Sequence, residues 1–196
     1  MRIRAMMLAL GATAALGMSA SGAAAATLFT TSAHTTPVAT GSAFSVAATS
    51  PFVLTSATSA LNTCSSSTLS GTITSNGTTT GTVVGSITSG TLAGCTPFSF
   101  QVTFPSAWAL TVPGAAETAG DTTTWTNSQL HNFRFTANNG PYSGTLAGLR
   151  AAETKGAGPI CIQFADAGTI TGPLTGNGRV DTNYCFTGAS ASYSLG

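Results

Sequence analysis

The segment Thr68–Thr88, "TLSGTITSNGTTTGTVVGSIT", indicates the fold class, because two strand-like runs flank a cluster of turn residues. The runs are "TLSGTITS" and "GTVVGSIT", and "NGTTTG" lies between them. Asn76-Gly77 suits a turn with positive φ, a conformation that glycine and asparagine adopt at low cost. The long linker makes a two-residue hairpin only one option. The segment predicts two antiparallel strands.

The plainest strand is "FSFQVTF", Phe98–Phe104, because aromatic and aliphatic residues alternate with polar ones. Alternation places every second side chain on the same face of a strand. Pro105 ends this run, and Trp108, Leu110 and Val112 alternate in the next one, "AWALTV". Both runs predict strands with one apolar and one polar face.

Seven more strand candidates follow the same rule, at residues 43–48, 51–56, 122–129, 131–137, 142–149, 160–164 and 191–196. The one stretch of helix formers, "GLRAAETKG" (148–156), is too short to stand alone as a helix. About ten short antiparallel strands predict an all-β domain over residues 27–196, built as a β-sandwich or a small closed barrel. Outer-membrane barrels use longer strands with lipid-facing aromatic girdles, so we disfavour that class.

The first 26 residues have the pattern of a secretory signal peptide. Arg2 and Arg4 form a positive n-region, and Ala5–Met18 forms an apolar h-region. Ala24–Ala26 then supplies an A-x-A cleavage site before Thr27. The apolar run is too short for a membrane helix of about 20 residues. The pattern predicts export and a secreted or cell-surface protein.

The mature chain carries very little charge. Removing 26 of the 196 residues leaves 170, and the loss of Arg2 and Arg4 leaves four of the six basic residues against five acidic ones. Nucleic-acid binding needs clustered cations, so we expect no nucleic-acid partner. A surface covered by Thr, Ser and Gly loses electrostatic repulsion, which favours self-association or attachment to the cell envelope.

The even number of cysteines in an exported chain indicates two disulfide bonds. Three connectivities exist, and we favour Cys64–Cys95 with Cys161–Cys185 because each pair brackets one hairpin-like segment. A zinc site is disfavoured, because the chain has no C-x-x-C spacing and only two histidines. We expect no metal and no cofactor.

Catalytic candidates are few. His131 and Asp166 could join a serine in a hydrolase site, but no G-x-S-x-G elbow positions one. Alternation in "SQLHNFRF" places His131 on the face of Phe133 and Phe135, which indicates a core or edge histidine. His34 is expected to be an exposed polar residue. The sequence therefore predicts no catalytic residues and no enzyme, with a small secreted hydrolase as the least favoured reading.

The segment Ile160–Phe186, "ICIQFADAGTITGPLTGNGRVDTNYCF", contains a stretch with some features of a calcium loop. Asn177, Asp181 and Asn183 are the oxygen ligands on offer, but a calcium loop of the EF-hand kind needs several carboxylates. We therefore predict a disulfide-closed hairpin, and leave open a weak calcium site near Asp181.

An extracellular carrier of small apolar ligands is the alternative function. Its cavity would be lined by Phe98, Phe100, Phe104, Trp108, Trp125, Phe133 and Phe135. Inward aromatics in a small β domain usually pack a closed core instead.

The segments "LNTCSSSTLSGTI", "ITSGTLAGCTPF", "WALTV" and "PICIQF…AGTITGPLTGNGRVD…YCF…YSL" resemble small, uncharacterised exported proteins of high-GC soil bacteria. The resemblance spans nearly the whole mature chain and implies only the topology and the cysteine pairs. Residues 64–108 are also similar to secreted alkane-oxidation activator proteins, which are linked to cell surfaces and biofilms. The leading interpretation is an exported, non-enzymatic cell-surface or extracellular-matrix protein.

Overall fold

The computed structural model of the protein describes residues 26–55, 60–77, 81–102, 104–114, 116–137, 140–154, 158–172 and 178–196. The predicted signal peptide lies outside these ranges except for Ala26. That residue is buried, and its backbone N–H donates to the Gly81 carbonyl at 3.2 Å. Cleavage before Thr27 stays a prediction.

Thirteen strands and one short 3-10 helix make up the described chain. Their bounds are β1 Leu28–Phe29, β2 Ala43–Ala48, β3 Phe52–Thr55, β4 Ala60–Asn76, β5 Thr82–Thr96, β6 Phe100–Val102, β7 Trp108–Pro113, β8 Ala116–Ala119, β9 Thr122–Ala137, β10 Gly140–Thr154, β11 Cys161–Thr171, β12 Gly178–Phe186, η1 Gly188–Ser192 and β13 Ser194–Leu195.

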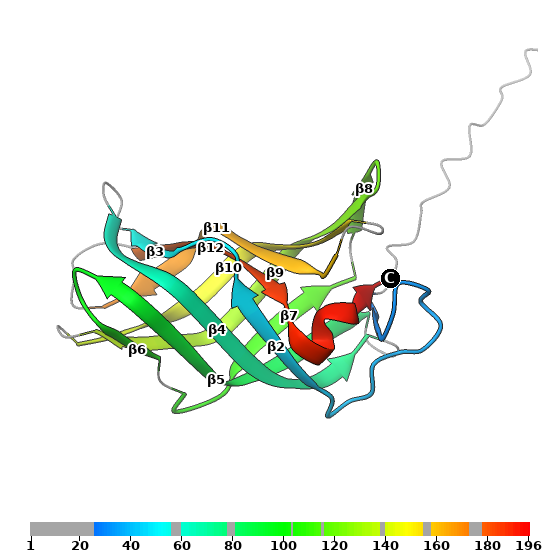
Figure 1. Cartoon of the computed structure of the whole chain (residues 1–196), viewed down its shortest axis with the longest axis horizontal. Helices are drawn as coiled ribbons and strands as arrows, with labels where there is room; N and C mark the ends of the chain where they lie inside the picture. The colour runs from blue at the N-terminus through cyan, green and yellow to red at the C-terminus, as the bar shows by residue number, and fades with distance from the viewer. Residues whose placement is uncertain are drawn as a thin grey trace, which may run out of the picture.

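Eight of these strands form a closed antiparallel barrel (Figure 1). Neighbours follow the order β10, β11, β12, β2, β4, β5, β7 and β9, and pairing of β9 with β10 closes the ring. The all-β prediction is confirmed. Of the two predicted architectures, β-sandwich and small closed barrel, the structure shows the closed barrel. In a barrel of eight strands, side chains are just large enough to fill the interior.

The barrel strands are longer than the predicted segments, because neighbouring segments merge. The candidates at 122–129 and 131–137 form the single strand β9, and the helix formers after 148 continue the strand β10. Asn127 and Asn132 take positive φ values of 62° and 59° inside β9. Such residues form bulges that bend a long strand around a barrel without ending it.

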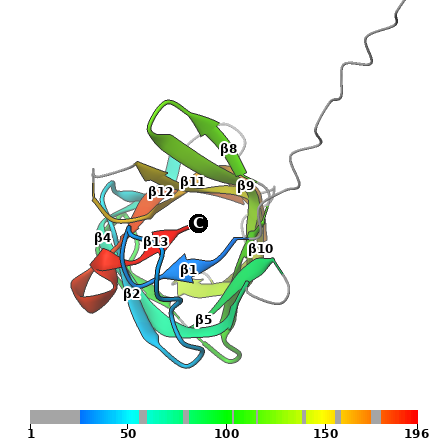
Figure 2. The same ribbon diagram turned by 90° about the vertical axis from the view of Figure 1, so that its right-hand side faces the viewer.

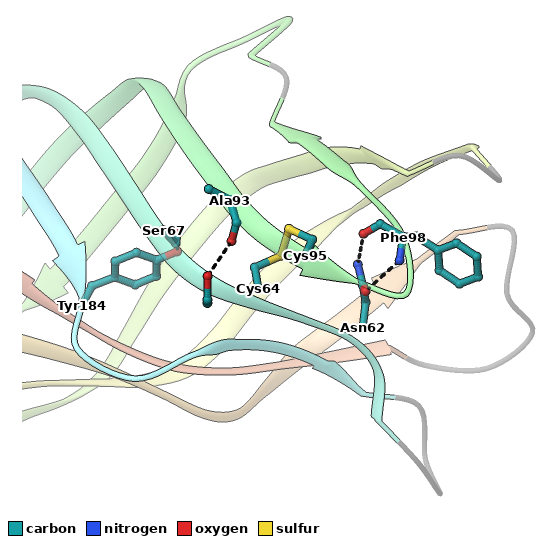
Figure 3. The surroundings of a disulfide bond; sticks show 8 residues. Asn62, Cys64, Ser67, Ala93, Cys95, Phe98 and Tyr184 are labelled. Atoms are coloured by element: carbon teal, nitrogen blue, oxygen red, sulfur yellow. Dashed lines mark hydrogen bonds between the residues drawn. A yellow bond between two sulfur atoms is a disulfide. The ribbon is translucent and has the colours of Figure 1, made fainter.

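The predicted strand Phe98–Phe104 is wrong at both ends, since β6 covers only Phe100–Val102. Phe98 lies in the preceding loop with its side chain 45% exposed. The buried amide of Asn62 replaces strand pairing there: its Nδ2 donates to the Phe98 carbonyl at 2.8 Å, and its Oδ1 accepts from the Phe98 N–H at 3.2 Å (Figure 3).

Side chains inside the barrel are mostly apolar and closely packed. The core contains an aromatic cluster, in which Phe135 stacks on Tyr142 at 4.9 Å between ring centroids and Trp108 lies against Phe133 at 4.7 Å. Outward positions on β4 and β5 are mainly Ser and Thr.

Both disulfide bonds join residues that face each other on paired strands. Cys64 and Cys95 are register partners on β4 and β5, and Cys161 and Cys185 are partners on β11 and β12. The hairpin prediction for Ile160–Phe186 is thereby confirmed where the chain is described. Figure 3 shows the Cys64–Cys95 bond, which links the neighbouring strands β4 and β5.

The two ends of the described chain meet in one opening of the barrel (Figure 2). Leu28 of β1 pairs with Leu195 of β13, and both leucines are buried in the core. We call this two-stranded sheet the terminal plug. Its side chains complete the apolar interior and leave a cavity of about 20 Å³, which holds little more than one water.

Burial raises the pKa of the Tyr184 phenol, and the hydrogen bond with Ser67 offsets this only in part. Because the neutral phenol is favoured in the fold, the stability that Tyr184 provides is complete below about pH 10 and is lost as pH rises further. Alkaline titration followed by tyrosinate absorbance should show that Tyr184 ionises only as the barrel unfolds, and the lagging signal should be missing in Tyr184→Phe. Ionisation of all three tyrosines before unfolding would contradict this.

Candidate functional site

His34, Ser194 and Glu153 form a connected polar network beside the terminal plug. The Nε2 atom of His34 lies 2.5 Å from Ser194 Oγ, and that hydroxyl donates to Glu153 Oε1 at 2.6 Å. Glu153 comes from β10, and its Oε2 also accepts the Leu195 N–H at 2.6 Å. An imidazole, a hydroxyl and a carboxylate therefore converge at this end of the barrel.

The order of hydrogen bonds differs from that of a serine nucleophile. A hydroxyl can donate only one hydrogen bond. Because Ser194 donates to Glu153, the His34 Nε2 must be the donor in its contact with Ser194. In a catalytic triad, by contrast, the histidine accepts the serine proton. Ser194 is also only 1% exposed. The network acts as a clasp that holds β13 against β10.

A groove of about 380 Å³ lies beside the clasp. Ser32, His34, Asp121, Thr123 and Glu153 line it together with Leu195 of the plug. The prediction that His34 is exposed agrees with the structure. Its partnership with Ser194 was not predicted, because 160 positions separate the two residues and no local pattern signals that contact.

A second clasp holds the other strand of the plug. The side chain of Asn76, at the end of β4, accepts the Leu28 N–H at 2.7 Å and donates to the Leu28 carbonyl at 2.8 Å. It also donates to the Val38 carbonyl at 2.6 Å. The sequence pattern around Asn76 indicated only a turn, but its buried amide pairs with β1 as a neighbouring strand would.

The predicted placement of His131 is wrong. His131 pairs with Ala109, which alternates with the inward Trp108 and Leu110, so His131 faces outward. The bulge at Asn132 explains the error, because it shifts the alternation before Phe133. Asp166 lies on β11, but its side chain is outside the described part of the structure, so a site joining it to His131 stays untested.

The residues of the calcium hypothesis lie on β12 or outside the described ranges. Asp181 is exposed and Asn183 is half-buried, and both alternate with inward Val180 and Thr182. Asn177 lies outside the described residues. Within the described ranges, no three His, Cys, Asp or Glu side chains gather as metal ligands.

Most aromatics of the carrier hypothesis pack against one another. Phe100, Trp108, Trp125, Phe133 and Phe135 are buried, while Phe104 is half-buried and Phe98 is exposed. The apolar cavity of about 20 Å³ lies elsewhere, among residues that include Leu28 and Leu195 of the plug. Ligand pockets usually enclose about 300 to 1,000 Å³, far more than this cavity.

One half of the barrel wall is uncharged. No Lys, Arg, Asp or Glu occurs between Arg4 and Glu117, and the neighbouring strands β2, β4, β5 and β7 all fall in that interval (Figure 1). We call their outward residues the uncharged wall: Ala43, Ser45, Ala47, Ser66, Thr68, Ser70, Thr72, Thr74, Val84, Ser86, Ser89, Thr91, Ala93, Ala109 and Thr111. The described charged residues belong to β8–β12 and their connections.

Hydroxyl groups on the uncharged wall form hydrogen bonds with one another between neighbouring strands. Ser45 Oγ and Ser70 Oγ lie 3.0 Å apart, and Thr68 Oγ1 and Thr91 Oγ1 lie 2.8 Å apart. The charge distribution is readable in the sequence, but only the strand order shows that the uncharged strands are neighbours.

No known family model, curated protein or solved structure matches this chain. The described part of the chain has no helix with the length and hydropathy needed to cross a membrane.

Replacing Asn76 with alanine should loosen the plug, because the Leu28 N–H and the Leu28 and Val38 carbonyls lose a buried partner. We expect a loss of about 3 kcal/mol in the free energy of unfolding, measured by urea denaturation. Hydrogen exchange at the Leu28 amide should also become faster.

Asn183→Ala is the matched control, since this half-buried side chain faces outward. Its expected effect is below about 0.5 kcal/mol. Equal losses in the two variants, or unchanged exchange at Leu28 in Asn76→Ala, would show that Asn76 does not hold the plug.

Proposed function

We propose that the protein is an exported, non-enzymatic component of the cell surface or extracellular matrix, and that it makes contacts there through the uncharged wall. The observation that carries the proposal is the position of this wall, an outer surface of Ser, Thr and Ala with Val84 over four neighbouring strands.

The chemistry of the wall supports association with other surfaces. Proteins stay apart in solution partly through the repulsion of their net charge, and this wall contributes none. Thr68, Thr91 and their neighbours offer short hydroxyls, which cost little conformational entropy when a contact orders them. The paired hydroxyls at Ser45–Ser70 and Thr68–Thr91 already hold fixed positions.

Export is supported by the two disulfide bonds. Disulfides persist in oxidising compartments and are rare in the cytoplasm. Each bond joins directly paired strands, so the reduced chain would lose a covalent link across the barrel wall at both places.

A non-enzymatic role is supported by how the reactive side chains are used. Ser194 and Glu153 are committed to the clasp on β13, and His34 completes it. Ser194 is buried, and its hydroxyl donates a hydrogen bond to the Glu153 carboxylate. This hydroxyl is therefore poorly placed to attack a substrate.

Thr72→Lys with Thr91→Lys tests the wall directly. We expect the unmodified protein to self-associate or bind the producing cells, with little weakening by salt because no charges take part. The two lysines should abolish both, since each contact would bury an ammonium or bring like charges together. Sedimentation velocity and a cell pull-down measure the outcome.

The control places the same two charges on the other half of the barrel, as Thr154→Lys with Thr171→Lys. Both threonines are exposed and lie on β10 and β11. This variant should associate as the unmodified protein does. A protein that stays monomeric at every concentration and does not bind cells would overturn the proposal.

A further inference from the structure

The barrel wall has a gap beside β9, on the charged half. β6 pairs with Phe135–Ala137 and β7 pairs with residues 129–131, so along this edge no described strand pairs with Asn132–Arg134. The loop before β7 crosses the gap, and the Asn132 side chain reaches it by donating to the Ala107 carbonyl at 3.4 Å. A groove of about 340 Å³ lies at this place.

The groove combines an arginine side chain with hydroxyl groups. Arg134 lies on its wall, exposed, and it has no hydrogen bond or ion pair with any residue that the structure describes. Ser106 on the loop, and Ser143 and Thr145 on β10, also line the groove. Ser143 is the direct register partner of Arg134, so the two side chains are neighbours on the same face of the sheet.

One energetically costly feature lies in this groove, and a second lies in the core next to one of its lining residues. Asn132 holds a left-handed backbone conformation with φ at 59°. Trp108 packs against Phe133, which lines the groove, and its buried indole Nε1 has no hydrogen-bond partner among the described residues. Strained backbone and unpaired buried donors cost free energy and often gather at functional sites.

We propose that this groove binds a carboxylate flanked by hydroxyl groups, the chemistry of a uronic acid. A guanidinium presents two parallel N–H donors that match a carboxylate, which makes arginine the specific partner of that group. Ser106, Ser143 and Thr145 then exchange hydrogen bonds with the hydroxyls of the ligand. The groove volume falls in the range of small-molecule sites.

Isothermal titration with sodium glucuronate and with oligogalacturonate tests the proposal, using glucose and acetate as comparison ligands. Binding should be strongest for a ligand that has both the carboxylate and the hydroxyls. Arg134→Gln should weaken it at least ten-fold, and Arg134→Lys by less. Arg150→Gln is the matched control, because Arg150 is also exposed and unpaired within the described residues, but lies outside the groove.

Binding of glucuronate itself would support the proposed site and indicate that its ligand is a free sugar acid. Binding of the oligomer alone would support it with an acidic polysaccharide. Equal weakening in Arg134→Gln and Arg150→Gln, acetate binding as tightly as glucuronate, or no binding of either acid would overturn it. Should Arg134→Gln fail to fold, a shift of the Arg134 Nε–H resonance on adding glucuronate to the unmodified protein decides the question. No residue of the uncharged wall lines this groove, so a failure to bind these acids would leave the association proposal untouched.

Discussion

Pairing of β9 with β10 closes the sheet, and the rest of the structure depends on that closure. Closing the ring gives each of its eight strands a neighbour on both sides, although β5 pairs with β7 only over residues 82–87. Closure also separates an inside from an outside. The apolar alternate residues then bury one another, and the Ser and Thr residues between them become an outer surface that needs few charges to stay hydrated.

Closing the wall leaves two open ends, and polar side chains hold the chain at both. β4 begins near Asn62 and ends at Asn76, and each buried amide binds the backbone N–H and carbonyl of one residue as a strand would. Asn62 holds Phe98 at one end of the barrel, and Asn76 holds Leu28 of the terminal plug at the other. Glu153 adds a third support by binding β13, so the plug is fixed on both of its strands.

Local alternation predicted much of this fold because it is a property of neighbouring residues. The candidate at 43–48 matches β2, the alternation of Trp108, Leu110 and Val112 matches β7, and the two cysteine pairs join strands as predicted. Alternation failed at His131, where the bulge at Asn132 reverses the facing of the chain. It also failed at Phe98, whose position is set by Asn62, a residue 36 positions away.

The site was less predictable than the fold, since its contacts are long-range. His34 meets Ser194 only because the plug brings the two ends of the described chain together. The uncharged wall is different: its residues are visible in the sequence as a run without charge, while their assembly into one surface requires the strand order.

This division of the barrel into an uncharged half and a charged half is the basis of the functional account. One half presents hydroxyl groups and no charge, and the other presents Arg134 in a groove.

The most direct test is to fractionate producing cells and follow the mature protein by mass spectrometry, with and without reductant. We expect recovery in the cell-bound or matrix fraction, with all four cysteines protected until reduction. Recovery only as a free monomer in the medium, or in the cytoplasm with reduced thiols, would contradict it.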